Sequence, residues 1–275
     1  MSTEKFLEFR NVSKVYGSRD GPVRALEALN LAFDEGSFVC IVGPSGCGKT
    51  TLLQIVGGFV SPSSGEVRLS GRPVTGPGPD RGVVFQQPAL FPWMNVYQNA
   101  EFGLMVRHIK GRERSDRVER YLRLVGLWDF RKHYTYQLSG GMQQRLAIAR
   151  VLINNPRVLL LDEPFGALDA LTRERMQEEL HNIWARSGMT ALFITHSVEE
   201  AVYLGTHVVV MSSRPGRVLD LLEVGFSRQT GRDDIRSIKS SSEFVAVREK
   251  VLSLIWSSAT LSSGSRADVA RNATA

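Results

Sequence analysis

The chain has 275 residues, of which 43% are hydrophobic and 23% are charged. These fractions are typical of a folded globular protein and exclude a chain that is disordered over most of its length. Because this length is large for one domain, we expect one domain with an inserted or appended subdomain. The 34 Lys and Arg against 28 Asp and Glu give a net charge of +6. This modest excess favours an ordinary solvated surface and leaves nucleic acid or an anionic membrane surface open as partners.

The sequence pattern carries no membrane or export signal. No apolar run approaches the roughly 20 residues that span a bilayer. The first ten residues, MSTEKFLEFR, lack the basic start and the apolar stretch of a secretory signal. The two cysteines, Cys40 and Cys47, are too few for a disulfide framework or a metal cluster. We therefore expect a protein of the cytoplasm.

The predicted strands fall into two groups. Short runs with turn signals between them indicate a small antiparallel layer near the N-terminus, at residues 5–17, 24–33 and 65–71. Other runs of Val, Leu and Ile with little alternation are typical of a parallel sheet buried on both faces, at residues 37–42, 82–86, 157–162, 189–195 and 207–211. Helical patterns lie between these runs, which indicates an α/β architecture. One such helix carries Met176, Leu180 and Ile183 on one face, with Gly188 as its expected C-terminal cap.

The strongest chemical signal is GPSGCGKTT at residues 43–51, which matches G-x-x-x-x-G-K-[ST] between a predicted strand and a predicted helix. The glycines allow successive backbone N–H groups and the positive end of the helix to meet phosphate oxygens. Lys49 adds a positive charge at the β- and γ-phosphates, and the Thr50 hydroxyl can ligate Mg²⁺. The residues expected to hold the nucleotide here are Gly43, Pro44, Ser45, Gly46, Cys47, Gly48, Lys49, Thr50 and Thr51.

Cys47 lies just before the expected helix. Because a helix N-terminus can lower the pKa of a thiol, we expect a reactive thiol whose alkylation blocks nucleotide binding. The alternative is a side chain that only fills space in the packing.

The P-loop motif and the strand and helix patterns together predict the fold class. It is an α/β P-loop NTPase core with a mainly parallel sheet, an N-terminal antiparallel β layer and an inserted helical subdomain.

Acidic residues follow a later buried strand. VLLLDEP places Asp162 at the carboxyl edge of the sheet, where ligands of open α/β sheets bind, so Asp162 is the expected partner of Mg²⁺. The adjacent Glu163 can accept a proton from an attacking water. His196 ends the next strand at the same edge, where an imidazole could reach the γ-phosphate. Ordinary solvation of a loop is the alternative for the acidic pair, and a structural role is the alternative for His196.

The segment from about residue 87 to 156 has no central strand and is predicted to be a helical subdomain inserted between two strands of the core. It contains LSGGMQQR at residues 138–145, where Ser139 is a plausible N-cap and two glycines follow at a cost of roughly 1 kcal/mol each relative to Ala. On the residues alone, this segment is a helix start followed by flexible residues, which gives no reason for two adjacent glycines.

The C-terminal part is predicted to be one helix followed by a tail. Serine caps open the stretch at residues 240–256, and its apolar residues recur at helical intervals: Phe244, Val247, Val251 and Ile255. Residues 257–275 are small, polar and aperiodic, and we expect them to be disordered. The predicted boundaries are 5–225 for the nucleotide-binding domain, 226–256 for an extension with the amphipathic helix, and 257–275 for the tail.

These motifs, in this order, resemble the ATP-binding subunits of ABC transporters. The P-loop at 43–50, LSGGMQQR at 138–145, LLLDEP at 159–164, ALD at 167–169 and His196 carry the resemblance, which covers about residues 5–225. It implies that ATP and Mg²⁺ are the ligands, with ATP hydrolysed by Glu163 as the general base and His196 as the switch on the γ-phosphate.

The resemblance implies further roles for individual residues. Tyr16 falls where the family stacks an aromatic ring on adenine, with a core tyrosine as the alternative. Gln86 occupies the place of the glutamine that senses Mg²⁺ and the attacking water. Ser139, Gly140 and Gly141 would meet the ATP held by a second copy of the chain, and Asp169 matches the acidic residue that lies across that interface. The commonest family pattern is LSGGQ, so Met142 departs from it, and we expect Met142 to pack with the rest of its helix.

The resemblance also implies partners. Two copies would pair head to tail on the cytoplasmic face of the inner membrane, against two transmembrane permease subunits, with a periplasmic substrate-binding protein acting indirectly and with no nucleic acid partner. The apolar residues 91–94 are a candidate docking surface for the permeases, with burial in the subdomain as the alternative.

Segments such as GPGPDRGVVFQQPALFPWMNV and SSRPGRV resemble the nitrate, sulfonate and taurine branch of importers. They place taurine first, other alkanesulfonates second and nitrate third as cargo. Two other classes stay open. A soluble ABC ATPase that does not transport would carry a long coiled-coil insertion or two ATP-binding halves, and a P-loop kinase would not need LSGGM.

Overall fold

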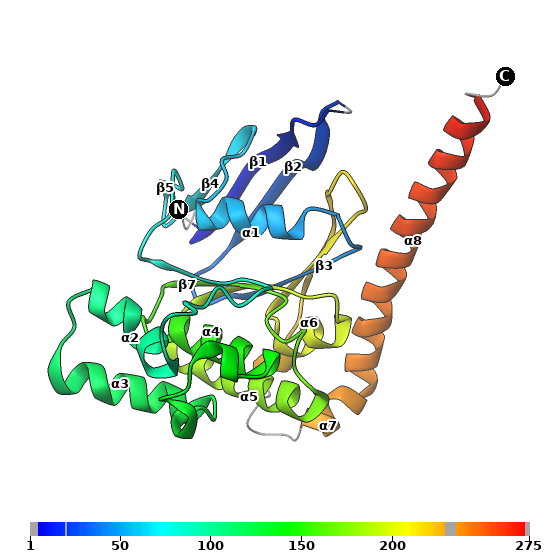
Figure 1. Ribbon diagram of the computed structural model, residues 1–275. Helices are drawn as coiled ribbons and strands as arrows, with labels where there is room; N and C mark the ends of the chain where they lie inside the picture. Colours follow the sequence, from blue (N-terminus) through cyan, green and yellow to red (C-terminus); the bar gives the residue numbers. More distant parts are fainter. Residues whose placement is uncertain (1–4, 20, 229–234, 273–275) are drawn as a thin grey trace. The chain divides into compact units, whose positions relative to one another are not determined.

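The computed structural model describes residues 5–19, 21–228 and 235–272 (Figure 1). Two compact units divide the chain. Unit 1 combines Met1–Pro77 with Leu192–Ala275, and unit 2 is Gly78–Ala191. The α/β class is confirmed in both units, because each contains parallel strand pairs together with helices. Unit 2 is larger than the predicted insertion at residues 87–156, since it also holds the two strands that flank that insertion and a further helix.

Unit 1 contains the predicted antiparallel layer. Its sheet has the order β2-β1-β4-β5, and its strands are β1 (Leu7–Tyr16), β2 (Val23–Phe33), β4 (Ser64–Leu69) and β5 (Arg72–Pro73). Leu7 is paired with Phe33 on one side and with Leu69 on the other, and all three side chains are buried. Helix α1 (Lys49–Gly57) lies beside this sheet (Figure 1).

Unit 1 also contains a second sheet, in which the strand order runs β10-β9-β3-β8. Strand β3 (Phe38–Val42) pairs in parallel with β9 (His207–Met211), and β10 (Val218–Glu223) pairs with β9 in the antiparallel direction. All five residues of β3 are buried, as expected for a strand covered on both faces. Strand β8 (Thr190–Ile194) begins in unit 2 and ends in unit 1.

Helix α6 (Val198–Leu204), the short turn η3 (Phe226–Arg228), α7 (Ile235–Ser240) and α8 (Ser242–Asn272) complete unit 1. Ser241 caps α8, since its Oγ accepts a hydrogen bond from the Phe244 N–H, as the serine-rich start predicts. Phe244 and Val251 are fully buried, and the ring of Phe244 meets that of Phe226 edge-on. The first turns of α8 are therefore anchored by apolar contacts.

The predicted tail differs from the structure over residues 257–272, which continue α8 as a helix. A helix that has already begun gains one backbone hydrogen bond for each residue added. No proline interrupts this segment, and its single glycine costs roughly 1 kcal/mol. Composition alone therefore missed the helix. The last predicted tail residues, 273–275, lie outside the described residues.

Unit 2 begins with β6 (Arg81–Val84), which pairs in parallel with β7 (Val158–Asp162). The intervening segment is helical, as the absence of a strand pattern predicts, and consists of α2 (Val96–Val106), α3 (Gly111–Leu124), η1 (Trp128–Phe130), η2 (Thr135–Gln137) and α4 (Gly140–Leu152). Helix α5 (Ala170–Ser187) follows β7 and ends at Gly188 in the left-handed conformation, φ 68°. Gly188 is thus the cap that the sequence predicts.

The turn before α2 is held by a buried amide. Asn99 is fully buried, and its side chain bonds to the backbone of Phe91 in both directions and donates to the Met94 carbonyl. Phe91 is half-buried against Phe102 and Arg150, whereas Trp93 is 70% exposed. Residues 91–94 therefore divide between the two predicted alternatives, with Phe91 packed inward and Trp93 presented to solvent.

Among the described residues, no helix has the length and apolar character needed to cross a bilayer.

Candidate functional site

The P-loop, residues 43–50, joins the end of β3 to the start of α1 within unit 1. The Lys49 side chain folds back over the loop, where its ammonium donates to the carbonyls of Gly43 at 2.7 Å and Pro44 at 3.0 Å. Lys49 is 8% exposed. The two carbonyls are neutral groups and place this ammonium near the start of a helix, a position that suits an anionic ligand.

Close packing behind the loop explains one of its glycines. Gly48 has φ 96°, a conformation that side chains with a Cβ rarely adopt. A methyl group on Gly48 would lie 2.6 Å from Cδ2 of Leu26 and 2.9 Å from the carbonyl oxygen of Ala25. The P-loop therefore packs closely against β2, and only glycine fits at position 48.

The structure contradicts the expected reactivity of Cys47. The side chain is fully buried, and burial raises the pKa of its thiol, an effect that the neighbouring Lys49 ammonium opposes only in part. The Lys49 Nζ lies 3.7 Å from Cys47 Sγ. A helix N-terminus can lower the pKa of a thiol, but desolvation by burial raises it and is the larger effect at Cys47. The burial and the raised pKa favour the packing alternative for Cys47 over a reactive thiol.

Tyr16 ends β1 close to the start of α1. Its hydroxyl donates to Thr51 Oγ1 at 3.5 Å, the Lys14 ammonium lies 5.0 Å from its ring centroid, and the residue is 37% exposed. The ring is therefore not a core side chain. Unit 1 brings Tyr16 together with the P-loop helix, as its predicted role requires.

His196 is exposed directly after β8, and a buried polar network holds the turn that carries it. The Thr195 hydroxyl donates to the Glu200 carboxylate at 2.5 Å and accepts from the Ser197 N–H at 3.0 Å. Thr195 and Glu200 are 2% and 8% exposed. Sequence reasoning missed Glu200, although the spacing of Ser197 and Glu200 is that of a capping box, and Ser197 Oγ does accept the Glu200 N–H.

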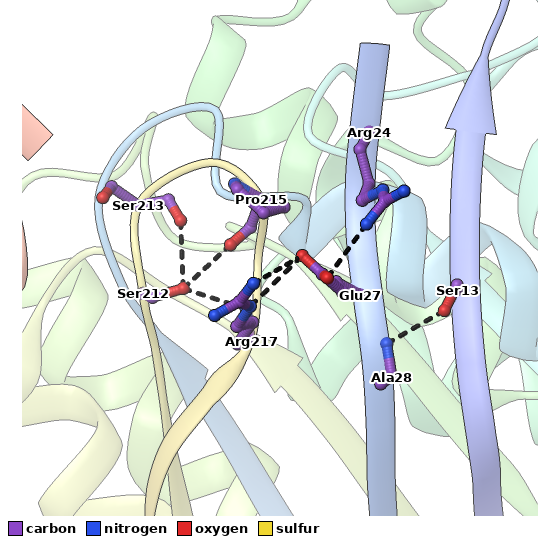
Figure 2. Close-up of polar contacts among 8 residues, drawn as sticks. All are labelled: Ser13, Arg24, Glu27, Ala28, Ser212, Ser213, Pro215 and Arg217. Atoms are coloured by element: carbon purple, nitrogen blue, oxygen red, sulfur yellow. Dashed lines mark hydrogen bonds and ion pairs between the residues drawn. The ribbon is translucent and has the colours of Figure 1, made fainter. Parts of the chain in front are cut away.

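The loop between β9 and β10, residues 212–217, belongs to the segment SSRPGRV, for which the sequence predicts no role at the site. Ser212 Oγ donates to the Ser213 and Pro215 carbonyls and accepts from the Arg217 N–H, which closes the loop on itself (Figure 2). The Arg217 guanidinium contacts the Glu27 carboxylate on β2 at 2.9 Å. That ion pair and the hydrogen bonds from Arg217 lower the pKa of Glu27. The residues of SSRPGR indicate a turn. They do not indicate that Arg217 pairs with Glu27, because Glu27 lies on a strand that is far away in the sequence.

In unit 2, Gln86 and Glu163 meet. The Gln86 amide donates to the Glu163 carboxylate at 3.2 Å. Both residues lie two positions beyond the paired residues Val84 and Leu161, the last pair of the β6–β7 ladder. Glu163 has φ 46°, in the left-handed region that is uncommon for a residue with a side chain and is concentrated at functional sites. Asp162, the last residue of β7, is 5% exposed.

The signature segment, residues 138–145, begins helix α4. Ser139 is its N-cap and accepts a hydrogen bond from the Met142 N–H at 3.3 Å. A Cβ on Gly140 would meet no atom within 4 Å, so this glycine faces open space. Gln143 donates to the carbonyls of Thr135 and Leu138 and is therefore occupied inside the subdomain.

Asp169 is exposed at the start of α5, where its carboxylate accepts the Thr172 N–H at 2.9 Å. This hydrogen bond lowers the pKa of Asp169. Leu168, next to it, lies beside the signature segment, since a Cβ on Gly141 would be 3.3 Å from Leu168 Cδ2. Unit 2 thus gathers the signature segment and residues 167–169, as well as the pair Gln86 and Glu163. Unit 1 gathers the P-loop and Tyr16.

Comparisons with known proteins agree with these motifs. A family model described as ABC transporter matches residues 26–166. A taurine import ATP-binding protein of Pelagibacter ubique is 47% identical over 248 residues, which cover 90% of this chain and 94% of the relative. A protein of the same description in Escherichia coli is 47% identical over 246 residues, or 89% and 96% of the two chains. An uncharacterized ABC transporter ATP-binding protein of Methanocaldococcus jannaschii is 46% identical over 249 residues, or 90% and 91%.

Solved structures match as well. A dimeric ATP-binding cassette in a post-hydrolysis state, bound to ADP and Pi, has 34% identity and a TM-score of 0.73, and the match covers 80% of this chain and 99% of that one. A dimeric bacterial ABC transporter cassette has a TM-score of 0.74 with the same identity and coverage. With its P-loop, signature segment and acidic strand end in this order, the chain belongs to the ABC transporter family of ATP-binding proteins.

Proposed function

We propose that this protein is the ATP-hydrolysing subunit of an importer for taurine. The hydrogen bond between Gln86 and Glu163 is the observation that best supports a hydrolase, because it places an amide against a carboxylate with an unusual backbone conformation. The P-loop of unit 1 supports a nucleotide as the substrate. The cargo is inferred from relatives 47% identical that are described as taurine import proteins.

The nucleotide would bind mainly to the P-loop and Tyr16, which belong to unit 1. The backbone N–H groups of residues 45–51 would surround the phosphates, and the ammonium of Lys49 would neutralise part of their charge. The half-exposed ring of Tyr16 has a face for stacking on the adenine. The donors fit Mg²⁺, which prefers hydroxyl and carboxylate oxygens, and Thr50, Gln86 and Asp162 are its proposed protein contacts. When bound, Mg²⁺ would offset negative charge on the phosphate oxygens.

Glu163, Gln86 and His196 would each have a separate role in ATP hydrolysis. Glu163 would take the proton from the attacking water at its carboxylate, with the Gln86 amide orienting that carboxylate through the observed hydrogen bond. His196, held by the turn of Thr195 and Glu200, would contact the γ-phosphate. Because the carboxylate is fixed before the reaction, less reorganisation is needed in the transition state.

A second copy of the chain would complete each site. The backbone of Ser139, Gly140 and Gly141 would approach the ATP of the partner copy, since Gly140 leaves open space at this helix start. Asp169 would lie across the same interface. The two solved relatives are both dimeric, which supports this arrangement.

The importer would also require two permease subunits and, on the far side of the membrane, a substrate-binding protein. The present chain would attach to the cytoplasmic face of the inner membrane through the permeases. Trp93, which is 70% exposed, supports residues 91–94 as part of the docking surface.

The cargo can be tested by deleting the gene and growing cells with taurine, another alkanesulfonate or sulfate as the sole sulfur source, and with nitrate as the sole nitrogen source. We expect growth on taurine to be lost and growth on sulfate to be kept. A plasmid with the wild-type chain should restore growth on taurine, and a Glu163→Gln chain should not. Loss of growth on nitrate or on another alkanesulfonate alone would overturn the taurine assignment while keeping the importer.

A further inference from the structure

Arg214 lies beside the P-loop although it comes from the loop between β9 and β10. A Cβ built on Gly46 would lie 3.4 Å from Nη2 of Arg214, which places the guanidinium in van der Waals reach of the loop apex. Both residues are exposed, so the space around the guanidinium is open to a ligand. Arg214 lies in the segment SSRPGRV, for which the sequence predicts no role at the nucleotide site.

The loop that carries Arg214 is fixed to the same elements as the P-loop. Gly216 donates its N–H to the Ala25 carbonyl at 2.9 Å and accepts the Glu27 N–H at 3.0 Å, so residues 212–217 are bonded to β2. A Cβ on Gly216 would lie 2.0 Å from the Cys47 carbonyl oxygen, which shows how tightly the two loops pack. The internal bonds of Ser212 close the same loop (Figure 2). The backbone under Arg214 is therefore preorganised.

Arg214 differs from its neighbours because it has no anionic partner among the described residues. Arg217 and Arg24 both contact the Glu27 carboxylate, each at 2.9 Å. By contrast, no hydrogen bond or ion pair joins Arg214 to any part of the chain that the structure describes. An arginine that is held against a phosphate-binding loop and has no carboxylate of its own can offer its planar donors to a bound phosphate group.

We propose that Arg214 is a further phosphate-binding residue of the nucleotide site, in addition to Lys49. From its position beside Gly46, the guanidinium would attract the phosphates through its positive charge, or its side chain would rotate and donate a hydrogen bond to a phosphate oxygen. The proposal rests on the proposed function only in that the P-loop must bind ATP. A nucleoside polyphosphate is favoured over other anions because the nearest backbone belongs to the loop that cradles phosphates.

The test is nucleotide binding to the full chain, measured by titration calorimetry at protein concentrations where sedimentation shows a monomer. Arg214→Gln should weaken the binding of ATP by about fivefold, the effect of one exposed charge pair of roughly 1 kcal/mol. Arg214→Lys should keep most of the affinity, because the charge remains. Arg72→Gln is the matched control, since Arg72 is an exposed arginine on β5, at the far edge of the sheet from β2.

Salt separates an electrostatic role from a structural one. In 1 M NaCl, where the Debye length is about 3 Å, the affinities of the wild type and Arg214→Gln should converge. A defect that persists unchanged in high salt would mean that the substitution disturbs the loop itself, and this would overturn the proposal. The melting temperatures of the variants should match that of the wild type.

Two other outcomes also decide the matter. If Arg214→Gln binds ATP as tightly as the wild type but dimerises less, Arg214 contacts the second copy and the proposal is wrong. If the wild type itself fails to bind ATP, both this proposal and the proposed function fail.

Discussion

The Gln86 amide donates a hydrogen bond to the Glu163 carboxylate, with 3.2 Å between Nε2 and Oε2. The two residues are 77 positions apart in the chain, and the parallel pairing of β6 with β7 brings them to the same edge. The helical segment lies between them in sequence, so Gln86 links the entrance of that segment to the proposed general base. Any movement of the turn after β6 would therefore reach the Glu163 carboxylate directly.

Replacing this carboxylate should separate hydrolysis from binding. We expect Glu163→Gln to lower the rate of ATP hydrolysis by at least about 100-fold, because a general base contributes that much or more. ATP affinity should stay close to that of the wild type, since the P-loop is unchanged. Single-turnover release of phosphate and equilibrium binding of ATP measure the two effects. Glu178→Gln, at an exposed position on α5, is the matched control and should hydrolyse normally.

Glu200 should behave as a positioning residue for His196. Glu200→Ala leaves the buried Thr195 hydroxyl without its carboxylate, which costs about 1–3 kcal/mol and loosens the turn that carries His196. We expect a lower kcat with little change in ATP affinity, and partial rescue in Glu200→Gln, whose amide oxygen can still accept. Glu199→Ala, at the half-buried neighbouring carboxylate, is the control.

A double-mutant cycle distinguishes this role from a general loss of stability. Adding His196→Ala to Glu200→Ala should lower kcat little further, because the two residues act through one group. Independent, additive losses in kcat would show that Glu200 does not act through His196.

The buried thiols should make the fold sensitive to alkaline pH. Burial raises the pKa of both Cys40 and Cys47 above the ordinary value, so the folded state favours their protonated forms. The corresponding stability is fully present below the pKa of the unfolded thiols, and it is lost as the pH rises through the folded-state values. Urea midpoints should fall between pH 8 and pH 10.5, and less so in Cys40→Ala. An equal pH dependence in that variant would exclude Cys40 as a source.

The same burial predicts slow chemical modification. At pH 7.5, we expect iodoacetamide to label Cys47 in the folded protein at least about tenfold more slowly than in urea, since only an accessible thiolate reacts. Mass spectrometry of the labelled peptide measures both rates. Rapid labelling of Cys47 in the folded protein would restore the expectation drawn from the helix N-terminus.

Gly216 should tolerate no side chain. A Cβ there would collide with the Cys47 carbonyl at 2.0 Å, so Gly216→Ala must push the β9–β10 loop away from the P-loop. Such overpacking costs about 1–3 kcal/mol. The urea midpoint should fall and ATP binding should weaken. Gly225→Ala is the control, because a Cβ on Gly225 meets no atom within 4 Å. Equal stability of the two variants would contradict the packing seen here.

Trp93 should matter for assembly and not for the isolated chain. It is 70% exposed, while the turn beneath it is held by the buried Asn99. We expect Trp93→Ala to weaken co-purification with the permease subunits by about 30-fold in affinity, the effect of losing one 2 kcal/mol hot spot. Hydrolysis by the isolated chain should be unchanged. Normal assembly of this variant with the permeases would remove residues 91–94 from the docking surface.

Much of the fold follows from local sequence. The apolar runs at β3 and β7 predict parallel strands that are buried on both faces. Side chains alternate between the two faces of a strand, so a strand with one solvent-exposed face would alternate polar and apolar residues. Gly188 predicts the end of α5 because glycine adopts positive φ at little cost. The roles of the individual site residues stay predictions, although Gln86 and Glu163 lie in contact as those roles require.

By itself, the sequence determined the motifs whose chemistry resides in a few consecutive residues: the P-loop, the signature segment and the acidic end of β7. Only the tertiary structure decided what depends on distant neighbours. The burial that raises the pKa of Cys47, the Glu200 carboxylate under Thr195 and the pairing of Arg217 with Glu27, 190 positions away, all arise from packing. Desolvation and ion pairing depend on distance in space, which local patterns do not encode. For the same reason, only the folded chain shows that the Arg214 guanidinium lies beside Gly46 of the P-loop.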